Sequence, residues 1–402
     1  MSGESATREL VFDPLTPGFT ADPFPLLRRL REDDPVHRSP LGFWVLTRYD
    51  DVARVLRSPR LFGTGLTHDS MRSRYGDGAA FAYVSRRLSS YDPPDHTRLR
   101  ALVTRAFTVR RVESMRSHIQ AIADRLLDGV GGAERMDVIA DLAHPLPSLV
   151  ICEMLDVAEA DRRQFSVWTG DIAFLLAPII APDRLATGEA AAGAFMAYVR
   201  DLIAERREAL GDDLLSALIT AEADGDRLTE DELVAMIVFL FSAGHQTTRD
   251  LVGNGLLALL QHRDQWQRLL AQPALLPAAI EECLRYDPSV TMFFRRALQD
   301  THIGDTPIPA GDRIFVSISA ANRDPARFDD PDRFDLDRRD NEHLTFGGGI
   351  HYCLGAALAR VEAHIIFATL LRRCPGIELT EDVIQWRDTP AFRGPIALRV
   401  AL

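Results

Sequence analysis

The sequence predicts a mainly α-helical protein with a minor β region. A capping box at Thr229 opens an apolar run that is long enough for a helix of about 30 residues. Several further stretches favour helices, whereas the β-favouring run 43–47 is short. No Ser/Gly tract, long charge run or internal repeat divides the 402 residues, so we expect one domain over residues 1–402, with an irregular leader over about residues 1–23.

The remaining elements follow from local signals along the chain. Prolines make residues 13–25 irregular, and glycines alternating with polar residues do the same for 58–90. Helices are expected over 26–32, 49–56, 112–130, 145–156 and 190–210, and strands over 43–47 and 298–303.

Charge and cysteine content narrow the class of protein. The net charge is −12 and the 46 basic residues form no stripe, which argues against a nucleic-acid partner. Cys152, Cys283, Cys353 and Cys374 form no CxxC pair, which fits a reducing cytoplasm. The polar N-terminus is no signal peptide, and the longest apolar run, 233–244, is too short to span a bilayer. We expect a soluble, cytoplasmic monomer that does not bind membranes.

A glycine-rich loop ending in one cysteine is the most informative motif. Phe346 and three glycines, beginning with Gly347, precede Cys353, and Gly355 leads into an apolar helix. Glycines let the backbone approach a bulky planar group, and a helix N-terminus favours the thiolate over the thiol. The loop suits a soft iron centre held by one axial sulfur.

Three further patterns carry polar residues at helical spacing. His96 and Arg100 are four apart and suit a carboxylate or phosphate, although a solvated surface pair remains the alternative. Glu282 and Arg285, three apart, suit an ion pair. Polar residues follow a small pair in Ala243-Gly244-His245-Gln246-Thr247-Thr248, inside an apolar helix, where water or a bound ligand is a natural partner.

The loop from Phe346 to Gly355 resembles the haem-binding signature of the cytochrome P450 superfamily, of the soluble bacterial, ferredoxin-dependent type. The resemblance runs from about Phe24 to the C-terminus. It implies a triangular helical prism enclosing haem b, with the Cys353 thiolate as axial ligand. It also implies a monooxygenase that hydroxylates or epoxidises a hydrophobic small molecule, in specialised-metabolite biosynthesis.

The resemblance assigns further residues to the haem and to its support. His96, Arg100, Arg295 and His351 fall where the family contacts the haem propionates. Glu282 and Arg285 fall on a buried lock, which Arg338 completes in the segment that precedes the cysteine loop.

On the central helix the sequence departs from the family. Ala243 and Gly244 fall on its small pair and Thr247 on its oxygen-activating threonine, but Gln246 replaces the usual acid. A neutral amide orients water but cannot titrate. Either Thr247 and ordered water complete the proton relay, or the enzyme runs a reaction less demanding of protons, such as radical coupling. His245 is expected to pack structurally.

Substrate contacts are expected from three segments. Pro178 and Pro182 break the apolar segment 165–182, and the break between it and the helix 190–210 resembles the family's lid. Its apolar residues Leu175, Leu176, Ile179 and Ile180 suggest an apolar substrate, with core packing as the equal alternative. The loop 58–90 resembles its roof, although it also reads as an ordinary surface loop. The candidate pocket residues are Phe239, Ser242, Ala243, Val290, Thr291 and Phe392.

Electrons must come from other proteins, because the chain has no recognisable nicotinamide, flavin or iron–sulfur motif. A ferredoxin and its reductase are the expected donors, with docking at a cluster of Arg98, Arg105 and Arg110. The alternatives are oxidative C–C or C–O coupling, peroxide-driven oxidation, or a haem-binding sensor without turnover.

Overall fold

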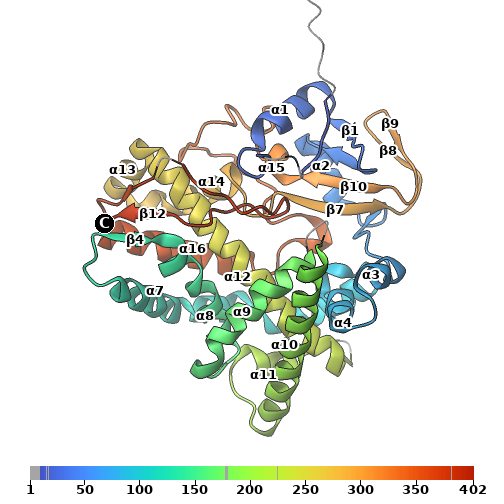
Figure 1. Ribbon diagram of the computed structural model, residues 1–402, viewed down its shortest axis with the longest axis horizontal. Coiled ribbons are helices and arrows are strands. Elements are labelled where there is room, and N and C mark those ends of the chain that lie inside the picture. The colour runs from blue at the N-terminus through green and yellow to red at the C-terminus, as the bar shows by residue number, and fades with distance from the viewer. Residues whose placement is uncertain (1–9, 15, 17, 177–179, 224, 382) are drawn as a thin grey trace, which may run out of the picture.

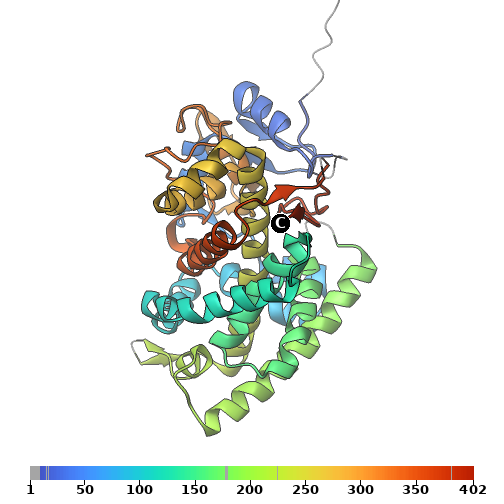
Figure 2. The ribbon, with the colours of Figure 1, turned by 90° about the vertical axis from the view of Figure 1, so that its left-hand side faces the viewer.

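The computed structural model describes residues 10–14, 16, 18–176, 180–223, 225–381 and 383–402. Its outline is roughly triangular, with a β-rich part along one side and helices filling the remainder (Figure 1). The helix α12 (Glu230–Gln261) runs through the middle of the molecule, as a view from the side also shows (Figure 2). The predicted class, mainly α with a minor β region, is confirmed.

The helices and strands have the following bounds. The helices before α12 are α1 (Phe24–Asp33), α2 (Tyr49–Arg57), α3 (His68–Tyr75), α4 (Ala79–Arg86), α5 (Asp95–Ala106), α6 (Val109–Ser114), α7 (Arg116–Val130), α8 (Pro145–Met154), α9 (Arg162–Ala173), α10 (Pro182–Glu208) and α11 (Leu214–Ile219). Those after it are α13 (Arg263–Ala271), α14 (Leu276–Tyr286), α15 (Ile318–Ala321) and α16 (Ala356–Arg373). Short turns of helix are η1 (Leu88–Ser90), η2 (Ile139–Ala143), η3 (Glu159–Asp161), η4 (Phe174–Leu176), η5 (Pro273–Leu275) and η6 (Gly349–His351). The strands are β1 (Val36–Arg38), β2 (Trp44–Leu46), β3 (Phe62–Gly63), β4 (Arg135–Asp137), β5 (Glu222–Ala223), β6 (Asp226–Arg227), β7 (Met292–Ala297), β8 (Thr301–Ile303), β9 (Thr306–Ile308), β10 (Arg313–Ser317), β11 (Glu378–Leu379) and β12 (Arg399–Ala401).

The main sheet joins the two ends of the chain. Its order is β1-β2-β10-β7-β3, with β2 and β10 parallel and the other pairs antiparallel. On β10, Ile314 and Val316 pack with α2 on one face, whereas Phe315 packs with the N-terminal segment on the other. Because successive strand side chains alternate between faces, both faces of the sheet are buried.

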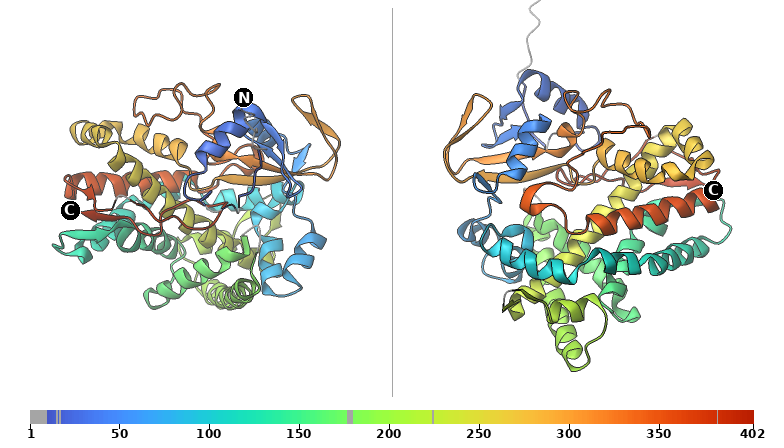
Figure 3. Two further views of the ribbon diagram at one scale, coloured as in Figure 1. Left: turned by 45° about the horizontal axis from the view of Figure 1, so that its top comes forward. Right: turned by 180° about the vertical axis from the view of Figure 1, so that it is seen from behind.

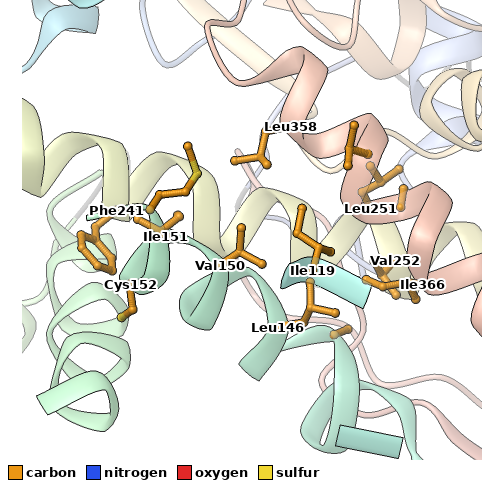
Figure 4. Close-up of a cluster of buried hydrophobic side chains, with 14 of the residues drawn as sticks. Ile119, Leu146, Val150, Ile151, Cys152, Phe241, Leu251, Val252, Leu358 and Ile366 are labelled. Carbon is orange, nitrogen blue, oxygen red and sulfur yellow. The ribbon is translucent and has the colours of Figure 1, made fainter. Parts of the chain in front are cut away.

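The largest core lies where α12 meets α7, α8 and α16. Figure 4 shows Val150 and Ile151 of α8, Leu251 of α12, and Leu358 and Ile366 of α16 meeting there. Seen from behind, α16 runs alongside α7 (Figure 3, right). No described helix combines the length and hydrophobicity needed to cross a bilayer.

The prediction that residues 58–90 are irregular is wrong, because the segment contains α3 and α4. Thr67 and Ser70 form a capping box at the start of α3, whose side chains are mostly exposed, so no apolar stripe marks it. The N-terminus of α4 is capped from α10, where Glu189 accepts the backbone N–H groups of Ala79 and Ala80 at 2.6 and 2.8 Å. A cap from 110 positions away leaves no local signal.

Other boundaries differ by less. The capping box of Thr229 and Glu232 starts α12 as predicted, and the helix has 32 residues. The helix expected from 190 begins at Pro182, which is tolerated in a first turn. The strand expected over 298–303 is limited to β8, and Arg295 lies inside β7 rather than before a strand. Pro178 and Ile179 of the expected lid lie outside the described residues.

A carboxyl group is buried between α16 and α12. Glu362 is 1% exposed, is hydrogen-bonded to Thr248, and leaves its Oε1 without a partner. Burial raises the pKa of Glu362 to about 8, and the bond to Thr248 opposes this only in part. The side chain is therefore a protonated acid at neutral pH.

We expect Glu362→Gln to make stability less dependent on pH. The folded protein keeps this proton up to about pH 8, whereas the unfolded chain releases it near the ordinary value of 4.5. The raised pKa therefore lowers the free energy of unfolding by about 1.4 kcal/mol per pH unit between those values, as pH rises. Urea unfolding at several pH values measures this slope, and an unchanged slope in the variant would contradict it.

Candidate functional site

The loop that carries Cys353 is shaped by two glycines with positive φ. Gly347 has φ 73° and Gly349 φ 62°, values that side chains rarely adopt. A Cβ at Gly349 would also lie 2.5 Å from the carbonyl oxygen of Leu56 in α2. The Cys353 N–H donates to the Phe346 carbonyl at 2.9 Å, and α16 begins three residues later. The loop therefore holds one sulfur just before a helix N-terminus, as predicted.

Opposing effects act on the ionisation of Cys353. Burial raises the pKa of its thiol, although backbone N–H groups at Gly355 and Ala356 and the Arg100 guanidinium lower it. The residue as a whole is nevertheless exposed. The N–H groups at the start of α16 therefore favour the thiolate, as predicted, and burial acts against them.

Four cationic or potentially cationic side chains gather beside the cysteine. His96 and Arg100 lie one turn apart on α5, Arg295 lies on β7, and His351 lies on η6. The rings of His96 and His351 are 4.2 Å apart, and Arg100 donates to the Tyr352 carbonyl at 2.8 Å. The structure therefore brings together the four residues that the sequence assigned to one anionic partner.

The electrostatics of this cluster fit the carboxylates of the expected haem. Both ring nitrogens of His96 are buried without a partner. Burial, with Arg295 and His96 adding to it, lowers the pKa of His351 to about 3, and burial lowers the pKa of Arg295 to about 10. At neutral pH the two imidazoles are therefore neutral donors, whereas Arg100 and Arg295 carry positive charge in a desolvated place, which suits two carboxylates.

The burial of α12 is interrupted near its middle. In residues 233–260, all of which the structure describes, Ala243 is the only exposed residue. Gln246 and Thr247 are half-buried, and Thr247 Oγ1 donates to the Ala243 carbonyl at 2.8 Å. Gly244 faces elsewhere, because a Cβ there would lie 2.7 Å from Ile151 of α8. Ala243, not Gly244, thus leaves room for a ligand, which corrects the expectation that both do.

His245 packs against α8, as expected. Its Nε2 donates to the His144 carbonyl at 2.9 Å, and the two imidazole rings are 4.6 Å apart. Burial lowers the pKa of His245 to about 3, with His144 adding to it, so the ring is neutral. The residue faces away from the exposed Ala243.

A buried ion-pair network lies behind the cysteine loop. Arg285 donates to both carboxylate oxygens of Glu282 at 2.8 Å, and Arg338 Nε lies 3.2 and 3.3 Å from the same oxygens. The side chains of Glu282 and Arg285 are at most 1% exposed. The three residues that the sequence grouped as a lock are therefore in contact.

The network continues to the residues just before Phe346. Arg285 donates to the Asn322 carbonyl at 2.9 Å, and the Asn322 side chain accepts the Leu344 N–H at 2.8 Å and donates to Thr345 Oγ1 at 2.9 Å. Thr345 Oγ1 in turn donates to the Leu284 carbonyl. Hydrogen bonds thus link Glu282 to the start of the cysteine loop without a gap.

The expected pocket residues divide into two groups. Ser242 Oγ lies 2.6 Å from Tyr83 Oη of α4 and donates to the Phe239 carbonyl, so this wall of α12 is tied to α4. Val290 pairs with Phe392 as an isolated bridge, which places both at the C-terminal turn. Thr291 is buried, and its hydroxyl donates to the Pro390 carbonyl, so it anchors that turn.

The expected docking arginines are not three free cations. Arg98 is paired with Asp226 at 3.1 Å and with Glu232. Arg105 donates to the Glu222 carbonyl at 2.8 Å, and Arg110 is exposed. The expectation of a cationic cluster fails at Arg98, because acids from β6 and α12 neutralise it.

The burial of three polar residues was not predicted from the sequence. Tyr83 and Glu362 are buried against α12, and Asp250 is buried within it. Asp250 could have been found from the sequence, because it is a titratable residue within an apolar helical run, one turn after Gln246. Tyr83 lay in a segment read as a loop, so its burial could not be foreseen.

Comparison with known proteins places the chain in a family. The cytochrome P450 family model matches residues 43–383. Cytochrome P450 107B1 of Saccharopolyspora erythraea is 43% identical over 378 residues, covering 91% of each chain. Mycinamicin IV hydroxylase/epoxidase of Micromonospora griseorubida is 40% identical, covering 92% of this chain and 93% of that protein.

A solved structure agrees with these matches. The polyketide biosynthesis P450 PksS of Bacillus subtilis is 39% identical, and its structure matches with a TM-score of 0.89, covering 98% of this chain and 100% of that chain. The haem expected by resemblance is the cofactor of this family, in which a cysteine thiolate ligates the iron. The chain therefore belongs to the cytochrome P450 family and is a haem-thiolate monooxygenase.

Proposed function

We propose that this protein hydroxylates or epoxidises a hydrophobic small molecule of specialised metabolism, with Cys353 as the axial ligand of its haem. The observation that carries the proposal is that His96, Arg100, Arg295 and His351 gather beside the exposed residue Cys353, with the two ring nitrogens of His96 buried and without a partner. The bound haem supplies the iron that activates dioxygen, and the thiolate donates electron density to it.

The basic cluster orients the cofactor. In the proposed arrangement, His96, Arg100, Arg295 and His351 donate to the two propionates, and Phe346 packs beside the sulfur with Arg360 4.5 Å from its ring centroid. Charge-assisted hydrogen bonds of this kind fix both position and orientation. Gly347 and Gly355 keep the loop close to the porphyrin, as the family pattern requires.

Thr247 and its neighbours act on the opposite face. The Thr247 hydroxyl, now bonded to the Ala243 carbonyl, turns to hold a water, and Gln246 orients water without titrating. Phe239, Ser242, Val290 and Phe392 line the substrate side in this proposal. Apolar side chains exclude bulk water there, which favours productive oxidation over release of peroxide.

The names of relatives support the substrate class. PksS is described as a polyketide biosynthesis enzyme, and the mycinamicin protein as a hydroxylase and epoxidase. We therefore propose a macrolactone or a related polyketide as substrate. Oxidative coupling remains a second candidate, because Gln246 removes the usual acid and coupling needs fewer protons.

Electrons are proposed to come from a ferredoxin and its reductase. The donor would approach the face where Arg100 reaches the Tyr352 carbonyl and Arg105 and Arg110 lie on α5 and α6. Such interfaces are small and weaken as salt rises. We propose that the enzyme acts as a monomer in the cytoplasm.

The substrate proposal is tested with haem-loaded protein and a panel of polyketide macrolactones. A substrate that displaces water shifts the spin state of the iron and appears in the absorption spectrum. Product formed under oxygen-18 gas must then carry the label. An unlabelled coupled product would favour the second candidate, and no spin change or turnover with any macrolactone would contradict the substrate class.

Replacing Cys353 with serine should abolish the thiolate signature of the reduced carbon monoxide complex. A serine hydroxyl is a far weaker ligand at neutral pH than a thiolate, so haem content should also fall. Cys374→Ser, at the end of α16, serves as the control and should retain the wild-type spectrum. A thiolate spectrum in Cys353→Ser would refute the assignment.

Glu282→Ala should lower the stability of the protein and its haem content. The change leaves Arg285 and Arg338 buried without their carboxylate, which costs about 3–5 kcal/mol. Haem content per folded chain and the urea midpoint measure the effect. Asp337→Ala, which removes the exposed partner of Arg268, is the control and should have a far smaller effect. Full haem occupancy in Glu282→Ala would argue against a supporting role for the network.

A further inference from the structure

Glu281, the neighbour of Glu282 on α14, joins the two ends of the cysteine loop. Arg360 Nε donates to its Oε1 and Arg360 Nη2 to its Oε2, each at 2.7 Å. His343 Nε2 lies 3.2 Å from the same Oε2. His343 precedes the loop, whereas Arg360 lies on α16, seven residues after Cys353. One carboxylate therefore connects the chain on both sides of the sulfur.

The hydrogen bonds of His343 determine which ring nitrogen carries the proton. The Thr345 N–H donates to His343 Nδ1 at 3.3 Å, so Nδ1 is the acceptor and Nε2 donates to Glu281. The side chain is 3% exposed, and burial lowers the pKa of His343, although Glu281 opposes this. The imidazole is therefore a neutral donor, and Arg360 supplies the charge opposite to that of Glu281.

Arg360 also contacts the aromatic ring at the start of the loop. Its guanidinium carbon lies 4.5 Å from the centroid of the Phe346 ring, a distance at which the ring face attracts a cation. The ring of His343 is 5.9 Å from the same ring. The Phe346 carbonyl accepts the Cys353 N–H at 2.9 Å. Glu281 therefore holds two side chains that pack around the residue bonded to Cys353.

The Glu281–Arg360 pair is charged at neutral pH. Burial would raise the pKa of Glu281, but the hydrogen bonds from Arg360 and His343 lower it to about 2. The bond to Glu281 raises the pKa of Arg360. Burial raises the pKa of the Cys353 thiol, and Arg360 is among the groups that lower it. The guanidinium is thus close enough to act on the charge of the sulfur, and the Glu281 carboxylate offsets part of that effect.

We propose that Glu281 and Arg360 are positioning residues for the cysteine loop and that their charges tune the reduction potential of the haem iron. The inference rests on the assignment of Cys353 as the axial ligand, proposed above. In the reduction step one electron passes from the ferredoxin to the ferric iron, and no bond forms or breaks. The site gains one negative charge, which nearby positive charge favours and nearby negative charge opposes. Arg360 therefore raises the potential, and Glu281 lowers it.

Redox titration of the haem-loaded protein without substrate tests the two charges separately. Arg360→Gln leaves the Glu281 carboxylate uncompensated, so the potential should fall. Glu281→Gln leaves the Arg360 guanidinium uncompensated, so the potential should rise. The side chains of Arg360 and Glu281 are 35% and 30% exposed, so each shift should correspond to about a two- to five-fold change in the equilibrium constant for reduction. Shifts in the same direction, or no shift, would overturn the proposal, because a loosened loop alone gives no opposite signs.

Arg372→Gln is the matched control, with the same substitution about 18 Å further along α16. The Arg372 side chain is 64% exposed and pairs with Asp124 at 2.9 Å, so its loss should leave the potential unchanged. Arg360→Lys keeps the charge but not the paired hydrogen bonds to Glu281. Its potential should stay near the wild-type value, while haem passes faster to apomyoglobin. A potential as low as that of Arg360→Gln would contradict the role of charge.

The outcomes separate this inference from the function on which it rests. If the reduced carbon monoxide complex of the wild type lacks the thiolate signature, the ligand assignment is wrong and the inference falls with it. If the signature is present and both glutamine variants have the wild-type potential, only the inference is wrong. Failure of every macrolactone to react leaves the inference standing, because the titration uses no substrate.

Variants that keep the charges decide the matter should the glutamine variants not take up haem. Arg360→Lys and Glu281→Asp each retain a charged side chain at the same position. The equilibrium constants for reduction of both should therefore lie within about two-fold of the wild-type value. A larger shift in either variant would rule the proposal out.

Discussion

The buried carboxylate of Glu282 is the interaction on which the site depends. It accepts hydrogen bonds from Arg285, Arg338, the Asp335 N–H and the Asn341 side chain, so both of its oxygens are hydrogen-bonded. An ion pair removed from water is stable only when its geometry and its further hydrogen bonds offset the loss of hydration. Arg285 meets that condition by also donating to backbone carbonyls at 322, 331 and 333. A segment without regular secondary structure thereby becomes a rigid support for the cysteine loop.

Burial affects ionisable groups at two places in this molecule, basic groups at one and acids at the other. Near Cys353 the basic groups lack acidic partners, so they are suited to an anionic cofactor. The acids Asp250 of α12 and Glu362 of α16 are buried, and burial raises the pKa of Asp250 to about 7 and that of Glu362 to about 8. Desolvation thus acts on both sets of groups, and the direction in which it moves the pKa depends on the charge that the group would carry.

The parts foreseen from the sequence are those encoded locally. The capping box at Thr229, the glycines around Cys353 and the spacing of Glu282 and Arg285 each specify their geometry within a few residues. The features that were not predicted depend on tertiary contacts. Helix α4 depends on Glu189 for its cap, and the thiol of Cys353 on how much protein surrounds it, and neither can be read from neighbouring residues. The pairing of Arg98 with Asp226 and Glu232 belongs to the same class.

Because Glu189 of α10 caps α4, two helices that are far apart in the sequence are held together. Tyr75 beside α4 also donates to the Leu175 carbonyl at 2.7 Å, so α3 and α4 are joined to the α9–α10 region at two points. Any outward swing of α10 uncaps α4, at a cost of about 1 kcal/mol for such a cap. The cap therefore adds to the packing between α10 and α4 in favouring the arrangement in which the two helices lie together.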